Sequence, residues 1–383
     1  MPPNSTPAIP LRIIIAVVLS HAAFIGCRFV LTLHAVALGA APGEVGLVLG
    51  VLMLGPMLLS VQYGRWADRW GYARLSGFSI ATVCVGGIAA AMASSLPVLY
   101  VASALVGTGY MLAYVSVVNA IARLTPSAEM TRAFAVLSIG FSFSPLAGPV
   151  VGGWVIDHYG HRAAYLTMLV STLASGAQFW WASRRYVLPP PPAASHARRR
   201  VWDLFRYPDL RAVFIVGGML SIGVDTFTLL APLQGVAAGL SATAVGITVG
   251  AFSVGSIAIR AALPWMSRRI GDWRIVMLAL FVTAAGFAVY PFLHHLWLLC
   301  AASAVLGMTL GASAPLAMTL ITGNAPAERV GEALGLRAAI ASAGQALVPM
   351  FLGGIGTAVG LGPVFWCGAL LMAAGGFVAT RRT

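Results

Sequence analysis

The sequence predicts an all-α integral membrane protein with twelve transmembrane helices, arranged as two parallel six-helix repeats. Composition is the first observation behind this fold class. Of the 383 residues, 59% are hydrophobic and only 9% are charged, whereas about 25% charged residues is usual in soluble domains. The second observation is the spacing of the residues that interrupt apolar segments. Charged residues, proline and glycine divide the chain into about twelve apolar runs, each near the roughly 20 residues that a spanning helix needs.

The third observation is that the chain resembles itself at an offset of 200 residues. The charged stretch 64–74 lies between two apolar runs, and 264–274 repeats that arrangement with Gly271 at the position of Gly71. Internal repeats of this kind indicate duplicated structural units. Six helices are an even number, so both copies enter the membrane from the same side and are related by an axis along the membrane normal.

The repeat predicts an N-terminal six-helix bundle at 1–182, a cytoplasmic linker at 183–209 and a C-terminal six-helix bundle at 210–383. The predicted spans are 12–38, 44–63, 74–94, 97–122, 132–156, 162–182, 210–236, 242–263, 274–293, 295–322, 332–358 and 362–380. Four consecutive prolines in the linker predict a semi-rigid spacer. The mixed apolar and basic segment 201–206 that follows predicts a helix resting on anionic headgroups.

The basic residues predict the topology. All of them are arginines, and they gather at the two termini and at the connections that follow even-numbered spans. By the positive-inside rule these segments and both termini are cytoplasmic, as expected for a multi-pass protein of a bacterial inner membrane. The net charge of +13 therefore reflects topology rather than nucleic-acid binding. The first apolar run is too long for a cleavable signal peptide and serves as the targeting signal itself.

Several function classes are excluded by what the sequence lacks. The four cysteines fall within predicted spans without a disulfide or metal-ligand spacing, and are expected to be packing residues. No nucleotide-binding loop, zinc motif or nucleophile with a positioned base is present, so we expect neither an enzyme nor a bound metal or cofactor. Without an ATPase domain, transport must be driven by a gradient. The sequence thus predicts a secondary transporter, expected to be monomeric, whose partners are a small-molecule substrate, protons and membrane lipids.

Two charged residues lie deep inside predicted spans. The first span carries His21, Arg28 and Thr32 on one face, and an arginine near the bilayer centre costs about 2.5 to 3.5 kcal/mol. In the seventh span, Asp225 is the only acid in the interior of any predicted span. Both charges lie about 20 to 25 Å from the cytoplasmic ends of their helices. We expect Arg28 and Asp225 to pair across a central cavity, where they couple protons to substrate; the alternative for Arg28 is a structural ion pair.

Three further residues are candidates for the cavity lining. Tyr110 and Tyr114 lie on one face of the fourth span with Ser103, and their hydroxyls need partners if they are buried. Gln345 lies in the eleventh span. We expect these residues and His21 to contact substrate or protons, with ordinary helix packing as the alternative.

The stretch that joins the second and third spans reads Gly64-x-x-Ala67-Asp68-Arg69-x-Gly71-x-x-Arg74. It resembles the conserved cytoplasmic loop motif of the major facilitator superfamily. That resemblance implies a charge network that stabilises the outward-open state, with gating roles for Gly64, Asp68, Arg69, Gly71 and Arg74. The alternative is a positive-inside anchor. The second copy departs from the motif, since Ser267 and Arg268 replace the Ala-Asp pair.

The fifth span contains Gly148-Pro149-x-x-Gly152-Gly153. This resembles the glycine-proline motif that marks antiport exporters in the same superfamily, and the alternative is plain helix packing. The exporters usually carry an arginine at the position of Ser103, so here the resemblance leaves Arg28 to supply the cavity cation.

Together these features predict a proton-coupled exporter of a small organic molecule that works by alternating access. A guanidinium in the cavity favours an anionic or zwitterionic substrate. Two alternatives stay open: an importer of the same fold, either a proton symporter or a uniporter, for a sugar or organic acid, and a membrane sensor that binds ligand without transporting it.

Overall fold

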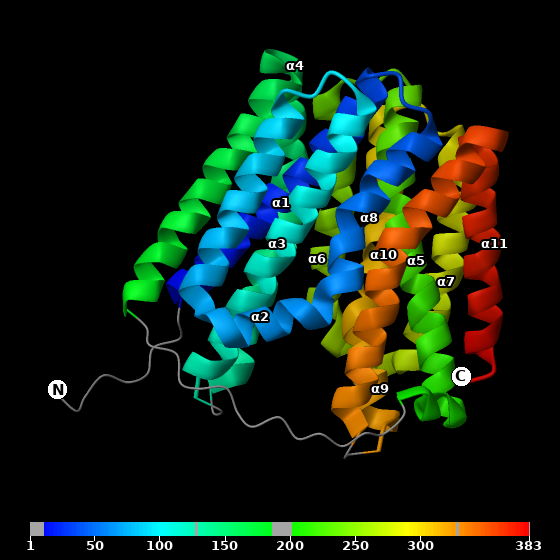
Figure 1. The fold of residues 1–383 in the computed structure, drawn as a ribbon. Coiled ribbons are helices and arrows are strands. Elements are labelled where there is room, and N and C mark those ends of the chain that lie inside the picture. The colour runs from blue at the N-terminus through cyan, green and yellow to red at the C-terminus, as the bar shows by residue number, and fades with distance from the viewer. Residues whose placement is uncertain (1–10, 127–128, 186–200, 327–328, 383) are drawn as a thin grey trace. The chain divides into compact units, whose positions relative to one another are not determined.

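The computed structural model describes residues 11–126, 129–185, 201–326 and 329–382, which are helical apart from short connections, with no β-strand among them. This confirms the predicted all-α class. The helices (Figure 1) are α1 Leu11–Ala37, α2 Pro42–Ala91, α3 Leu96–Leu124, α4 Met130–Arg185, η2 Val201–Arg206, α5 Pro208–Ala237, α6 Ala242–Ile270, α7 Asp272–Val289, η3 Tyr290–Phe292, α8 Leu296–Gly311, α9 Ser313–Asn324, α10 Val330–Val359 and α11 Leu361–Thr380.

The described helices provide eleven apolar stretches long enough to cross a membrane. One of them, Val136–Arg184, has 49 residues and would extend about 70 Å, far beyond the roughly 30 Å of a hydrocarbon core. Gly160 interrupts it with φ 80° and ψ 173°, so this stretch supplies two crossings and the total fits the predicted twelve.

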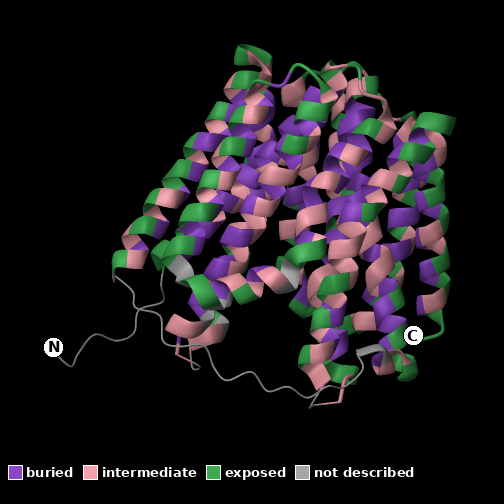
Figure 2. Cartoon of the chain, in the orientation of Figure 1, coloured by how far each residue is buried: buried purple, intermediate pink, exposed green. Residues whose placement is uncertain are grey.

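The chain forms two compact units, Met1–Leu38 with Val51–Ser195 and Gly39–Gly50 with His196–Thr383. The start of α2 therefore belongs to the second unit, where the backbone N–H of Gly43 donates to Thr357 Oγ1 at 2.7 Å. In the first unit α1 packs along α3 and α4, whereas in the second α6 packs along α8 and α7 along α11. Within each unit, Figure 2 shows buried and exposed residues sharing the same helices, as expected for helices with one lipid-facing side.

The same backbone contacts recur in both units at the 200-residue offset. A Cβ atom at Gly107 of α3 would lie 1.7 Å from the Leu52 carbonyl oxygen, and one at Gly307 of α8 would lie 1.9 Å from that of Phe252. Such distances leave no room for any side chain, so these glycines let the paired helices touch backbone to backbone.

A second recurring feature is a glycine at which the chain reverses its direction between two membrane crossings. Gly160 has φ 80° and ψ 173°, and Gly360, at the same position of the second repeat, has φ 84° and ψ 172°. Residues with a Cβ atom rarely adopt this conformation. Each glycine therefore ends one membrane crossing and begins the next.

Two stretches differ in local detail from the prediction. The stretch Gly64–Arg74 was expected to be a turn, but the backbone of α2 is helical throughout it; Figure 1 shows that α2 changes direction between its apolar spans Pro42–Leu59 and Ala73–Ala91. Glycine permits a turn without requiring one. The predicted span 295–322 corresponds to the apolar stretch Leu296–Asn324, within which Ala312 separates α8 from α9.

The structure describes only part of the predicted linker 183–209. Residues 186–200, including the four prolines, lie outside the described residues. Residues 201–206 form η2, a 3-10 helix of six residues, and their contact with headgroups stays a prediction.

We predict that Gly107→Val will strongly destabilise the protein, because the new side chain would overlap the Leu52 backbone and force α2 away from α3. Overpacking of this kind costs about 1 to 3 kcal/mol or more. The destabilisation is measured as a decrease in the thermal unfolding temperature of the purified protein in detergent.

Gly77→Val is the matched control, since no atom lies within 4 Å of a Cβ placed at this exposed position of α2. Equal unfolding temperatures for the two variants would contradict the assigned contact.

Candidate functional site

The polar face predicted for the first span lies on α1. His21, Phe24 and Arg28 follow one another at helical spacings of three and four residues, so they share a face. The hydroxyl Oγ1 of Thr32 donates to the Arg28 carbonyl at 3.0 Å, which satisfies the hydroxyl within the helix. The Arg28 side chain is half-buried in the middle of an apolar span. A charge at this depth is stable only against polar partners or water.

Around this face lies an aromatic cluster, formed by His21, Phe24, Tyr110, Tyr114 and Phe141. Phe24 and Tyr110 stack with ring centroids 4.0 Å apart and an interplanar angle of 11°. His21 lies 4.4 Å from Phe141 and 5.8 Å from Tyr110, and Tyr114 lies 6.0 Å from Phe141. Three helices, α1, α3 and α4, therefore bring together His21, Tyr110 and Tyr114, which the sequence predicted as site residues.

One atom of this cluster stands out chemically. The Nδ1 atom of His21 is buried and has no hydrogen-bond partner among the described residues. Leaving a buried polar atom unpaired costs about 1 to 3 kcal/mol, so the imidazole can accept or donate one more hydrogen bond at low cost, depending on its tautomer.

Small residues of α4 hold α1 in place. A Cβ atom at Gly148 would lie 2.8 Å from the Gly26 nitrogen and 3.0 Å from the Ala22 carbonyl oxygen, and one at Gly152 would lie 3.2 Å from Val30. Gly148 and Gly152 thus contact the part of α1 that carries the polar face. The other motif residues, Pro149 and Gly153, are buried in the same helix. The motif packs closely against α1; its antiport role stays a prediction.

In the second unit, Asp225 lies on α5 with only 3% of its surface exposed. Its carbonyl accepts a hydrogen bond from Thr228 Oγ1 at 3.0 Å. A Cβ atom at Gly344 of α10 would lie 3.3 Å from Asp225 Oδ2, so the absence of a side chain there makes room for the carboxylate. Gln345, the next residue of α10, is half-buried. Arg28 belongs to the first unit and Asp225 to the second, so their pairing stays a prediction.

The predicted gating stretch lies in the helical segment between the two spans of α2. Ala67 and Tyr63 are buried in a small core with Leu75 and Leu112 of α3, while Arg69 and Arg74 are exposed, and no neighbour lies within 4 Å of a Cβ at Gly64. The side chain of Asp68 and the surroundings of Gly71 lie outside the described structure. The charge network therefore stays a prediction. In the second copy, Ser267 Oγ donates to Asp272 Oδ1.

One arginine was not identified from the sequence. Arg260 of α6 donates from Nε to the carbonyl oxygen of Gly311 at 3.2 Å. Gly311 ends α8, directly before the break at Ala312, so its carbonyl needs a partner other than the next helical turn. The sequence feature that could have identified Arg260 is the presence of an arginine inside the predicted apolar span 242–263.

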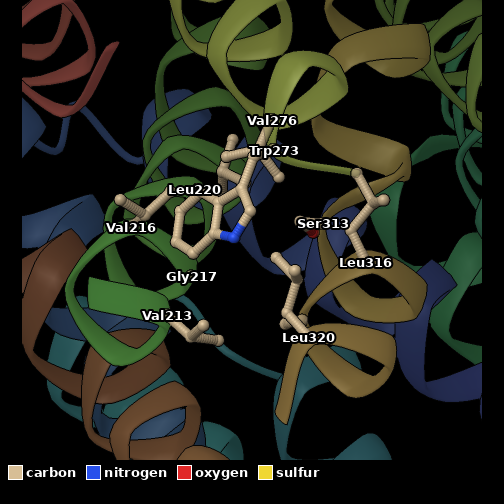
Figure 3. A pocket seen from close by; sticks show the side chains of 10 residues that line it. Val213, Val216, Gly217, Leu220, Trp273, Val276, Ser313, Leu316 and Leu320 are labelled. Carbon is tan, nitrogen blue, oxygen red and sulfur yellow. The ribbon is translucent and has the colours of Figure 1, made fainter. Parts of the chain in front are cut away.

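A narrow apolar cleft borders the helix after this break. Figure 3 shows Trp273 on one side and Leu316 and Leu320 of α9 on the other. The lining residues are Val213, Val216, Gly217, Leu220, Trp273, Val276, Ser313, Leu316, Ala317 and Leu320. None of them is charged.

Comparisons with known proteins agree on a family. The family model described as Major Facilitator Superfamily matches residues 13–295 and 213–382. The chain is 23% identical over 341 residues, 86% of both chains, to YuxJ of Bacillus subtilis (strain 168), described as an uncharacterized MFS-type transporter. It is 30% identical over 142 residues to Multidrug resistance protein D of Escherichia coli (strain K12), which covers 37% of this chain and 36% of that protein.

Solved structures show the same fold. A crystal structure of a mutant of the nucleoside transporter NupG matches with a TM-score of 0.79 at 13% sequence identity, covering 98% of this chain and 99% of the other. Together with the family match, this confirms the predicted fold of two parallel six-helix repeats.

We predict that Arg260→Leu will loosen α9, because the Gly311 carbonyl loses its donor at the helix break. Hydrogen bonds from charged groups contribute about 1.5 to 3 kcal/mol. Hydrogen exchange followed by mass spectrometry should show faster exchange in Ser313–Asn324 than in the native protein. Arg268→Leu, at an exposed position of the same helix, should leave that exchange unchanged, and equal exchange for both variants would refute the role of Arg260.

Proposed function

Because the chain belongs to the Major Facilitator Superfamily, a family of membrane transporters and not of enzymes, we propose that it exports a small organic molecule in exchange for protons. The observation that carries the proposal is Asp225, the only buried carboxylate residue among those described. A carboxylate in the middle of an apolar span is costly, so such residues are rare and mark functional sites. Its two protonation states, together with a permanently charged arginine, provide a coupling device.

The proposed cycle uses Asp225 as the proton carrier and Arg28 as its partner. When the cavity opens outward, a proton binds to a carboxylate oxygen of Asp225, the neutral acid no longer holds the polar or positively charged part of the substrate, and the substrate leaves. When the cavity opens inward, the proton leaves for the cytoplasm and the carboxylate becomes negative again. Since arginine keeps its proton, the carboxylate then pairs with Arg28 until a new substrate molecule takes its place.

Two features support export over import. The glycine-proline motif at Gly148–Gly153 resembles that of antiport exporters, and the proteins similar to this chain include several named as multidrug resistance proteins. Importers remain the main rival, because solved structures of the same fold include proteins named as nucleoside and peptide transporters. A sensor that binds without transport is the second rival.

The chain is a multi-pass membrane protein. We place it in a bacterial inner membrane with both termini in the cytoplasm, because the arginines gather at the termini and at the connections after even-numbered spans. We also propose that it acts as a monomer. Arg69 and Arg74 would then lie on the cytoplasmic side, where they gate the cavity with Asp68.

We predict that Asp225→Asn will abolish export, because an amide cannot carry the coupled proton. The measurement compares small molecules inside and outside cells that express the native protein, the variant, or neither. A compound depleted inside and enriched outside only with the native protein would support proton-coupled export.

Asp209→Asn is the control, because Asp209 lies at the exposed start of the same helix and forms an ion pair with Arg382. It should leave export intact. Accumulation of a compound inside the cells would favour the importer, and unchanged pools with a folded protein would favour the sensor.

A further inference from the structure

We infer that His34 and His161 form a pH-sensing pair, which fastens the last turn of α1 to α4 while the imidazoles are neutral and releases it when both are protonated. His34 lies in the last turn of α1, and His161 follows the turn at Gly160, where α4 begins its second crossing. The proposed topology, with cytoplasmic termini, places this end of both helices outside the cytoplasm. The inference therefore goes beyond the proposed transport function and adds a response to external pH.

The two imidazoles lie face to face where the helices meet. Their ring centroids are 4.8 Å apart, with an interplanar angle of 20°. The Nδ1 atom of His34 lies 3.3 Å from the hydroxyl oxygen of Tyr165 of α4, and the ring of His161 hydrogen-bonds to the backbone of Leu33. His34 and Tyr165 are buried, so most of this contact is shielded from water. Ring stacking and two hydrogen bonds thus join α1 to the second crossing of α4.

The charge of this contact depends on pH. An imidazole ordinarily titrates near pH 6.5, so both rings are neutral well above that value. One added proton can be accommodated, because a protonated imidazole donates hydrogen bonds from both ring nitrogens. Two added protons place like charges on rings 4.8 Å apart, a separation at which each charge disfavours the other. Acidification therefore turns an attractive ring contact into a repulsive one.

Other titratable groups of the first unit lie on the helices that pack at this end. On α1 they are Cys27 and Arg28, and Arg28 precedes His34 by six residues, about 9 Å along the axis. The first turns of α3 contribute Tyr100, and a phenol ordinarily stays neutral below about pH 9. These groups do not change charge in the range in which imidazoles titrate.

Near the turn of α4, the titratable groups are Asp157, His158, Tyr159 and Arg162, all of which are exposed. His158 donates from Nδ1 to the Trp154 carbonyl at 2.8 Å and stacks on the Trp154 ring. Arg162 follows His161 directly and adds a permanent positive charge. Asp157 is the only acid along the described length of α4, and solvent screens an exposed carboxylate. The repulsion between two protonated rings is therefore retained.

The rest of the contact between α1 and the second crossing does not titrate. Ser171 Oγ donates to the Leu19 carbonyl at 3.1 Å, and Ser175 Oγ donates to the Ala16 carbonyl at 2.6 Å. These bonds hold the opposite end of the two helices at every pH. At the histidine end, the turn itself is loosely surrounded, because no atom lies within 4 Å of a Cβ placed at Gly160. Protonation of the pair therefore opens one end of the contact and leaves the other closed.

Hydrogen exchange of the purified full-length protein in detergent, followed by mass spectrometry, tests the inference. Exchange is compared at about pH 7.5 and about pH 5, on either side of the imidazole range, after correction for the chemical effect of pH on exchange. In the native protein we expect Leu31–Ala37 to exchange about fivefold faster or more at the lower pH, as local opening requires. Exchange in Leu11–Ser20, beside the serines, should not change.

Three variants identify the groups that titrate. His161→Phe keeps a stacked ring that cannot be protonated, and it should remove most of the acceleration in Leu31–Ala37. His161→Gln should remove it as well, without the added hydrophobic ring. His158→Phe is the matched control on the same helix, since this histidine is exposed and bonded to Trp154, and it should respond to acid as the native protein does.

Three results would overturn the inference: equal acceleration in the native protein and both His161 variants, acceleration that includes Leu11–Ser20, or loss of the response in His158→Phe. The measurement requires no substrate and no proton exchange. Its failure would leave the Asp225-dependent export untouched, and a failure to detect export would leave the pH response of the pair untouched.

Discussion

The structure depends on the cost of placing charge inside an apolar bundle. Arg28 and Asp225 lie in the middle of helices whose other residues are almost entirely apolar, and neither charge is tolerated there without polar surroundings. The neighbouring helices are adapted to them. On α1, the face of Arg28 is continuous with the aromatic cluster, and on α10 a glycine at 344 makes room for the Asp225 carboxylate. The proposed function uses this cost, because protonation of a buried carboxylate changes the balance of charge in the cavity.

Close backbone contacts pack the helices of each unit against one another. Gly107 and Gly307 bring neighbouring helices together without side chains between them, and Gly148 does the same between α4 and α1. Membrane helices associate through such packing because lipid tails provide no hydrophobic drive between them. At the break between α8 and α9, Gly311 packs closely against Ser256 of α6, Arg260 donates to the Gly311 carbonyl, and an apolar cleft lies beside α9.

Most of the fold was predictable from the sequence, and the reasons are physical. The apolar runs predict the membrane crossings. The 200-residue offset predicts that equivalent contacts occur in both repeats, as they do at Gly107 and Gly307. The continuous helix through Gly64–Arg74 was not predictable, because glycine allows a turn and a helix alike. Arg260 was missed because an arginine near a span end is also what a cytoplasmic anchor looks like, and its acceptor is a backbone carbonyl that no side-chain pattern reveals. For the site, helical spacing placed His21 and Arg28 on one face. The sequence did not single out Phe24 and Phe141, since phenylalanines are common throughout the spans.

The pairing of Arg28 with Asp225 is the central claim, and a double-mutant cycle on stability tests it without knowledge of the substrate. The free energy of unfolding is compared for the native protein, Arg28→Gln, Asp225→Asn and the double variant. Removing one partner of a buried ion pair costs about 3 to 5 kcal/mol, because the other charge is left uncompensated. We predict that each single variant is destabilised and that the double variant is no less stable than the worse single variant. If the two losses simply add, as they do for distant, independent sites, the two residues do not interact and the proposed coupling mechanism is wrong.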